Sequence, residues 1–167
     1  MILGICGYGE HGKGTASRYL SYKYGLKYSQ STSEAAAGVV FSKLAPVYGY
    51  ETVEQAWDDR RNHRDEWASI IWEYNQPDGL TLYRDMLTDN EIIEGVRKEA
   101  ELLALREAGI LDYVIWIDAS LRVPVEGAAS CQVTPKLCDV TVDNNHDLHN
   151  MHQQLDYIYT NLIKGKS

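Results

Sequence analysis

The amino-acid sequence predicts an α/β fold in three layers, in which a parallel sheet of about five strands lies between helices. Two observations favour this class. An apolar run at 2–6 has the length of a buried strand, is bounded by Gly7, and is followed by a helical pattern that extends to about Tyr24. Strand-like and helix-like stretches then continue to alternate, and the clearest later strand lies at 113–118. This alternation is typical of a parallel sheet with helical crossovers.

Size and composition limit the function classes. The 167 residues suit one domain, which we expect to cover 1–167, and the contents of 44% hydrophobic and 24% charged residues are ordinary for a globular protein. The net charge of −8 argues against extended nucleic-acid binding, which depends on many Lys and Arg contacts. The chain has no apolar run that could span a membrane and no signal-peptide pattern, so we expect a cytoplasmic protein.

Helix start and stop signals place the remaining elements. Gly25 ends the first predicted helix, Pro46 ends the second, and a capping-box pattern at 52–55 opens the third. The expected helices cover about 13–24, 31–44, 52–75, 98–108 and 148–163. The expected strands cover about 2–6, 26–29, 91–96, 113–118 and 139–142.

The stretch between the first strand and the first helix carries the strongest motif. Residues 7–15 read Gly-Tyr-Gly-Glu-His-Gly-Lys-Gly-Thr, which fits the phosphate-binding P-loop pattern, with Gly14 standing between the lysine and the hydroxyl residue. Glycines allow a tight turn with inward N–H groups, and the helix N-terminus and the lysine add positive charge. The residues expected to bind ATP phosphates are Gly9, Glu10, His11, Gly12, Lys13, Gly14 and Thr15.

Arginines mark the predicted helix at 52–75. At about 100° per residue, Arg60, Arg61 and Arg64 fall on the same side as its apolar residues. A guanidinium along a buried face needs an anionic partner, and a substrate phosphate suits its forked geometry. The other interpretations are pairing with the protein's own acids and extension of the side chains to solvent.

Further candidates lie at predicted strand and helix ends. Glu94 and Arg97 follow a strand whose carboxyl end should lie on the ligand-binding edge of the sheet, although a structural salt bridge is the alternative. Ser33 lies in a group of hydroxyl residues that either cap the second helix or contact substrate. We expect a helical substrate-binding region at about 31–88. A short lid is expected at about 119–137, where Arg122 is either a catalytic or a surface charge.

These motifs resemble nucleoside monophosphate kinases. Gly7 to Thr15 is similar to the P-loop of adenylate kinases, and 92–97 is similar to their acidic strand end followed by a substrate-phosphate arginine. The stretch from Arg97 to the strand at 113–118, together with 140–144, resembles bacteriophage deoxynucleoside monophosphate kinases and their dephospho-coenzyme A kinase relatives. The chain differs in having Gly95 where the phage pattern has Asp, and in a short lid with few arginines.

The resemblance implies a P-loop NTPase fold and transfer of the ATP γ-phosphoryl group to a nucleoside monophosphate, most simply a deoxynucleotide. Lys13, Arg97 and Arg122 would be catalytic, and Asn144 would lie near the donor base. Mg²⁺ would bind Thr15 directly and Glu94 through water. The group expected to bind the acceptor is Ser33, Arg60, Arg61, Arg64, Glu94 and Arg97.

Three alternatives stay open at this stage. The acceptor of a P-loop kinase could be another small molecule, such as dephospho-coenzyme A or a modified nucleotide. A kinase for bases within DNA would need a basic groove, and a non-enzymatic nucleotide switch would need a guanine-recognition motif that the sequence lacks. The expected partners are ATP and a nucleoside monophosphate, with a homodimer as an option, in the cytoplasm, or in the host cytoplasm if a phage encodes the chain.

Overall fold

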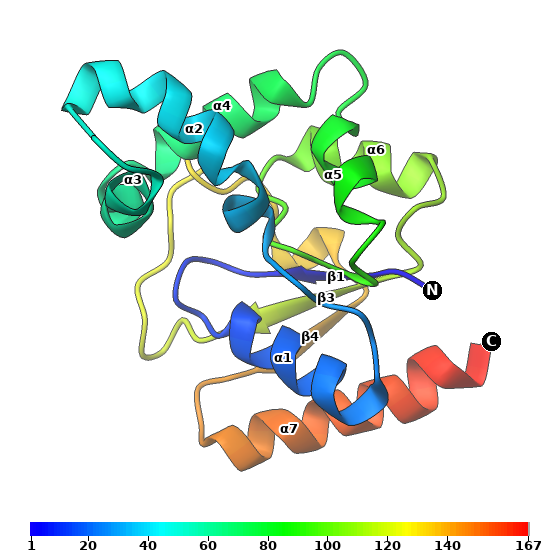
Figure 1. The fold of residues 1–167 in the computed structure, drawn as a ribbon. Coiled ribbons are helices and arrows are strands. Elements are labelled where there is room, and N and C mark those ends of the chain that lie inside the picture. The colour runs from blue at the N-terminus through cyan, green and yellow to red at the C-terminus, as the bar shows by residue number, and fades with distance from the viewer. Residues whose placement is uncertain (167) are drawn as a thin grey trace.

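The computed structural model describes residues 1–166 and has an α/β architecture around one parallel sheet (Figure 1). Its strands are β1 (Leu3–Cys6), β2 (Ile92–Glu94), β3 (Tyr113–Asp118) and β4 (Val140–Asp143). Its α-helices are α1 (Lys13–Tyr24), α2 (Thr32–Tyr48), α3 (Val53–Asp59), α4 (Arg64–Tyr74), α5 (Thr81–Met86), α6 (Glu99–Glu107) and α7 (Leu148–Tyr157). Shorter helical turns are η1 (Arg60–Asn62), η2 (Pro135–Leu137), η3 (Ile158–Ile163) and η4 (Lys164–Lys166).

The sheet contains four parallel strands in the order β2-β1-β3-β4. β1 lies in the centre, with Gly4 opposite Ile93 on one side and opposite Val114 on the other. Because all strands point the same way, their carboxyl ends meet at one edge of the sheet. The chain segments that leave this edge begin at Gly7, Gly95, Ala119 and Asn144.

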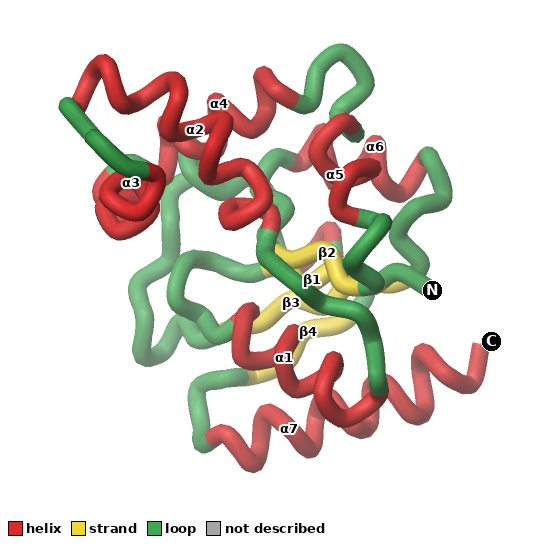
Figure 2. The backbone as a smooth tube through the Cα atoms, viewed as in Figure 1, coloured by secondary structure: helices red, strands yellow, loops and turns green. Residues whose placement is uncertain are grey.

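Helices cover both faces of the sheet, so the predicted three layers are present (Figures 1 and 2). α1 and α7 pack on one face, where the buried side chains include Leu20, Ile115 and Met151. α2, α4, α5 and α6 lie on the other face, over a second core that includes Tyr83, Leu102 and Trp116. The two cores arise because the strands are apolar on both faces, as expected for a parallel sheet buried between helices.

The predicted strand at 26–29 is wrong, and the sheet has four strands instead of about five. This stretch runs beside β2, but only one backbone bond of a ladder forms near it, from Glu91 N–H to Lys27 O at 2.7 Å. Side chains replace the rest: Asn90 Oδ1 accepts from Ser29 N–H at 2.9 Å, and Glu91 Oε2 accepts from Lys27 N–H at 2.9 Å. At the opposite margin, the Gln154 side chain bonds to both the N–H and the C=O of Asp143 in β4.

The predicted helix at 52–75 is also wrong as a single element. The capping box of Thr52 and Gln55 forms as expected, but α3 ends at Asp59 and the turn η1 leads to His63, whose backbone is not helical (φ −130°, ψ 31°). His63 binds Asp59 and Glu66 across the break, at 3.1 and 2.9 Å. A separate helix, α4, then begins at Arg64.

Two further boundaries differ from the sequence expectation. α2 passes through Pro46 and ends at Tyr48, with Gly49 as its C-cap. The proline lacks the N–H that would bond to the preceding turn, but the chain after it keeps helical bonding, as the bond from Gly49 N–H to Ala45 O at 2.8 Å shows. The final helix changes at Ile158 from α-helical to π-helical geometry. By contrast, α1 ends at Gly25 in a left-handed conformation, as predicted.

Candidate functional site

A cleft of about 370 Å³ opens at the carboxyl edge of the sheet. It is bounded on one side by residues 7–15, which we call the glycine-rich loop, and by the start of α1. On the other side lie Arg60, Arg61, Arg64 and Arg97, which we call the arginine wall. The remaining lining residues come from α1, α2, α3, the stretch before α2 and the end of β2: Arg18, Tyr28, Ser31, Ser33, Glu34, Trp57, Glu94 and Gly95. Segments far apart in the sequence therefore share one volume of the size of a small-ligand pocket.

The glycine-rich loop is held from outside by a buried amide. Gly12 has a left-handed backbone (φ 101°), and a Cβ added there would collide with the Asn144 side chain. Asn144 Nδ2 donates to the carbonyl of His11 at 2.9 Å. Glycine is therefore needed at position 12 both for conformation and for space.

Lys13 begins α1 and lies at the base of the cleft. Its Nζ donates to Tyr8 O at 2.8 Å, and the residue is 9% exposed. Burial and then the positive charge of Arg97 lower the pKa of Lys13 to about 8, although Glu94 and Glu126 act in the opposite direction. A bound anion would favour the charged ammonium. Anion binding in the cleft should therefore raise the pKa of Lys13, and protonation of Lys13 should strengthen anion binding.

His11 connects the glycine-rich loop to residues 119–134, which we call the crossing segment. The Ala119 N–H donates to His11 Nδ1 at 2.9 Å, which places the proton of a neutral ring on Nε2. Nε2 lies 3.3 Å from Pro124 O and can donate to it. The crossing segment has no α-helix or strand and passes from the end of β3 toward α4 (Figure 1).

The arginine wall closes over the loop. The guanidinium of Arg64 lies directly against Gly9, since a Cβ at that glycine would overlap it. Arg60 stacks on the Trp57 ring at 3.7 Å from the centroid and donates to Trp57 O at 3.0 Å. Arg61 is the most exposed of these side chains and pairs with Glu10 at 3.3 Å. Arg60, Arg61 and Arg64 therefore line the same cleft, although the helix is broken at His63.

A carboxylate from the crossing segment lies among these groups. Glu126 Oε2 accepts from Gly9 N–H at 2.5 Å, and both carboxylate oxygens lie 2.9 Å from Arg97 Nη1. Arg64 Nε lies 3.3 Å from Oε1. Burial by itself raises the pKa of Glu126, but Arg97, the Gly9 N–H and Arg64 together outweigh it and leave that pKa below its usual value. Glu126 is therefore an ionised carboxylate near neutral pH.

Glu94 ends β2 and faces the same cleft. The phenol of Tyr28 donates to Glu94 Oε2 at 2.5 Å. Burial and then the charge of Glu94 raise the pKa of Tyr28, so the phenol keeps its proton and remains a donor. One Glu94 oxygen is thus held by Tyr28.

The structure gathers most predicted site residues in the cleft and leaves three outside it. Arg122 and Asn144 do not line the cleft: Arg122 Nε donates to Asn144 O at 2.7 Å, and Asn144 supports the loop from behind. His11 belongs to the glycine-rich loop, but its side chain is fully buried and does not line the cleft. The predicted residues that line the cleft are Gly9, Glu10, Gly12, Lys13, Gly14, Thr15, Ser33, Arg60, Arg61, Arg64, Glu94 and Arg97.

Sequence reasoning missed several cleft residues. Arg18 follows Gly14 by one helical turn, and that spacing was a usable signal. Tyr28 and Trp57 also line the cleft, and nothing in their local sequence indicates it. Glu126 had no signal at all, since it lies in a segment without periodicity and reaches a loop 117 positions away.

Magnesium would find oxygen donors in this cleft. The Thr15 hydroxyl and the Glu94 carboxylate both line it, and hard oxygen ligands are those that Mg²⁺ prefers. Among residues 1–166, no group of three or more His, Cys, Asp and Glu side chains is arranged to hold a metal ion. Mg²⁺ bound with nucleotides commonly takes only one or two protein ligands, and phosphates and water supply the others.

Comparison with known proteins adds no relative. The sequence matches no family model, and no curated protein matches it significantly. Within the described part of the chain, no helix is both long and apolar enough to cross a membrane. Inference about function therefore rests on the cleft.

Proposed function

We propose that the protein is an ATP-dependent nucleoside monophosphate kinase of the P-loop type, acting on a ribo- or deoxynucleoside monophosphate. One observation carries the proposal: the cleft joins a glycine-rich loop with its lysine to four arginines from other parts of the chain. The loop suits one phosphate chain, and the arginine wall suits a second phosphate. A phosphoryl-transfer enzyme needs both within one site.

The glycine-rich loop would bind the donor. Its backbone N–H groups from Gly9 to Gly14 would hold the ATP phosphates, helped by the positive end of α1. Lys13 already lies in the cleft with its ammonium on Tyr8 O, and would move from this carbonyl to the β- and γ-phosphates. The bound phosphates would raise the pKa of Lys13 and keep it charged during transfer.

The arginine wall would bind the acceptor. Arg97 is the best placed for a phosphate, because its side chain is only 14% exposed and its guanidinium already binds a carboxylate. Arg64 adds a second guanidinium against the glycine-rich loop. A much smaller hollow of about 20 Å³ lies beside this wall, with Ser33, Trp67 and Ile71 among its lining residues.

The chemical step would require little from acidic or basic side chains. An oxygen of the acceptor phosphate forms a bond to the γ-phosphorus of ATP, while the bond from that phosphorus to the β–γ bridging oxygen breaks. The electron pair of the broken bond leaves with ADP, and the products are ADP and a nucleoside diphosphate. The acceptor oxygen is already ionised near neutral pH, so no general base is needed. Lys13, Arg64 and Arg97 would stabilise the charge on the transferring group.

Magnesium, when bound beside Thr15 and Glu94, would neutralise negative charge on the donor phosphates. Thr15 would offer its hydroxyl oxygen as a direct ligand. Glu94 would act through water, and Tyr28 would hold its carboxylate in a fixed orientation by the 2.5 Å hydrogen bond.

A turnover assay tests the proposal directly. The protein is incubated with ATP, Mg²⁺ and each of a panel of ribo- and deoxynucleoside monophosphates, and diphosphate formation is measured. Turnover with at least one monophosphate is expected. No turnover with any of them would reject the proposal, and slow ATP hydrolysis that no acceptor stimulates would favour a nucleotide switch instead.

A further inference from the structure

Glu126 occupies the point at which the glycine-rich loop and the arginine wall meet. Its contacts are one loop N–H, from Gly9, and two guanidinium groups, from Arg64 and Arg97. Phosphate oxygens take the same donors: backbone N–H groups and forked guanidinium groups. The carboxylate therefore fills a position whose chemistry suits a phosphate group.

The middle of the crossing segment contacts this position through that one side chain, and toward the end of the segment the Ser130 carbonyl also accepts from Arg97 Nη1, at 3.2 Å. At the ends of the segment, Ala119 and Pro124 bind His11, and Gln132 and Val133 donate to Arg97 O at 2.7 and 3.2 Å. Between 125 and 129, the described hydrogen bonds to other segments come from the Glu126 carboxylate alone, and its neighbours are exposed. The middle of the segment can therefore move without breaking an element of secondary structure.

We propose that Glu126 is a built-in occupant of a phosphate seat formed by Gly9 N–H, Arg64 and Arg97, and that an incoming phosphate group binds there by displacing it. The seat deepens the proposed function and rests on it, because it is the point between the donor and acceptor halves of the cleft. The ligand is a terminal phosphate, either the γ-phosphate of the donor or the phosphate of the acceptor.

Displacement follows from charge and geometry. A terminal phosphate carries a charge of about −1.5 to −2 near pH 7, whereas a carboxylate carries −1, and it has three oxygens to offer. Arg64 and Arg97 would change partner without being left unpaired in a half-buried position, which limits the cost of the exchange. Glu126 would move toward solvent together with the exposed residues that flank it. The occupant keeps the two arginines paired and in place in the absence of ligand.

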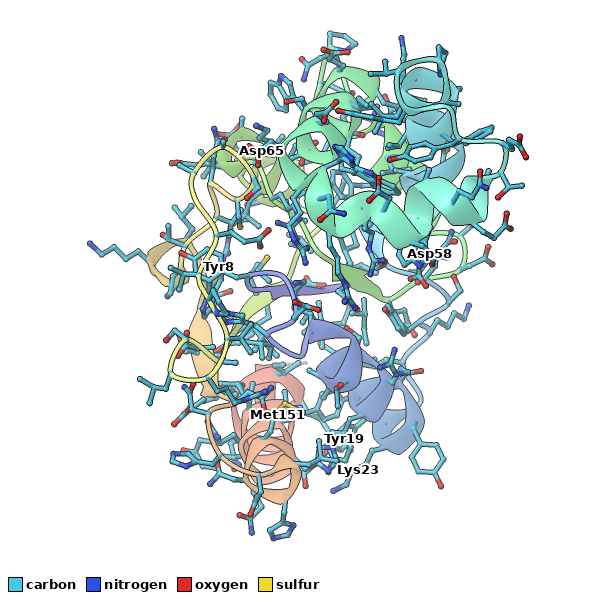
Figure 3. All side chains as sticks on the ribbon, turned by 90° about the vertical axis from the view of Figure 1, so that its left-hand side faces the viewer. Tyr8, Tyr19, Lys23, Asp58, Asp65 and Met151 are labelled. Atoms are coloured by element: carbon cyan, nitrogen blue, oxygen red, sulfur yellow. The ribbon has the colours of Figure 1, made fainter. Side chains whose placement is uncertain are left out.

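Binding of inorganic phosphate to variants is the first test, measured by calorimetry. Glu126→Gln is expected to bind phosphate about tenfold more tightly than the unchanged protein, a difference of about 1.4 kcal/mol. The matched control is Asp58→Asn, which also removes one negative charge near the arginines but from an exposed position on α3 (Figure 3). Its effect should stay below about threefold, because exposed charges are screened. Weaker binding by Glu126→Gln, or equal effects of the two variants, would overturn the proposal.

Proteolysis of the unchanged protein is the second test and requires no variant to fold. The Glu126 side chain is 11% exposed, so a glutamate-specific protease should cut after it slowly. Inorganic phosphate is expected to accelerate this cut at least threefold, as followed by mass spectrometry of the fragments. A rate that stays constant or falls would contradict displacement. Cleavage after the exposed Glu51 serves as the internal control for protease activity.

Nucleotides then distinguish the two sources of phosphate. Acceleration by ATP but not by ADP assigns the seat to the transferring phosphate, and acceleration by a monophosphate in the presence of ADP assigns it to the acceptor. The two proposals can fail independently. Diphosphate formation without faster cleavage after Glu126 would reject the phosphate seat but not the kinase activity. Faster cleavage without diphosphate formation would reject the kinase activity but not the phosphate seat.

Discussion

The two sides of the cleft are assembled in different ways. The glycine-rich loop is one continuous stretch whose shape is set by local backbone geometry and a few supporting contacts, such as the Asn144 amide on His11 O. The arginine wall combines a helical turn, the start of α4 and the stretch after β2, and its members are positioned by stacking on Trp57 and pairing with Glu126. The loop is recognised in the sequence as one motif, whereas the wall is assembled from the separate stretches 60–64 and 97, which only folding brings together.

The largest expected effect concerns the loop side. Lys13→Ala should reduce phosphoryl transfer by about 10³-fold, because a cation in a water-poor site next to the transferring group is removed. The fold should persist, since burial disfavours the charged lysine in the ligand-free protein. Steady-state kinetics and thermal unfolding measure both outcomes, with Lys27→Ala, an exposed position outside the cleft, as the control. Near-normal transfer in the Lys13 variant would end the kinase hypothesis.

The next effect compares two members of the arginine wall. Arg97→Ala should lower kcat/KM for the acceptor about 100-fold, since a nearly buried, forked contact to phosphate is lost. Arg61→Ala should change it less than about threefold, because that side chain is 64% exposed and its pairing with Glu10 is screened by solvent. The comparison is made with each variant at saturating ATP. Similar losses in both variants would show that the wall acts through its total charge and not through placement.

The pH dependence of nucleotide binding probes the loop in another way. Below pH 8 the free protein holds Lys13 charged, and above this value it loses the proton, because its pKa is about 8. A bound phosphate raises the pKa of Lys13, so binding of ADP above pH 8 takes up a proton. The affinity for ADP should therefore fall by up to about tenfold for each unit by which the pH rises above 8. Calorimetry from pH 6.5 to 9.5 measures the slope. Lys13→Arg should bind without this slope, and a slope that persists in it would assign the proton to another group.

The smallest effect concerns support of the loop. Asn144→Ala leaves the carbonyl of His11 without its amide donor and should lower the free energy of unfolding by about 1–3 kcal/mol. Urea unfolding measures this value. The control is Asn161→Ala, an exposed asparagine bonded to Tyr157 O, for which a change below about 0.5 kcal/mol is expected. Equal losses would mean that the loop does not depend on this contact.

The sequence was sufficient where neighbouring residues determine the structure. α1, β3 and the end of α1 at Gly25 were predicted because apolar runs and glycine stops act locally. The helix break at His63 was not predictable in the same way, because the helical pattern of apolar residues continues across it and the break is fixed by contacts to Asp59 and Glu66.

The residues of the candidate site also differ in whether their local sequence predicts them. Lys13 and Thr15 were found from a motif, and Arg97 from its place after a strand end. Glu126 could not be found, because an acid in an irregular segment has no pattern, and its importance arises only from the arrival of Arg64 and Arg97 around it. The predicted role of Arg122 came from its place in an expected lid and that of Asn144 from a resemblance, and the structure places both outside the cleft.

At both outer margins of the sheet, side-chain amides form hydrogen bonds with the backbone. Asn90 binds the chain beside β2, and Gln154 pairs with both the N–H and the C=O of Asp143, as the peptide group of a neighbouring strand would. Open strand edges attract strands from other molecules and promote aggregation. An amide that completes part of the ladder leaves less backbone free for such pairing. Asn90 and Gln154 thus occupy backbone groups at the two margins that a strand from another molecule would otherwise find free.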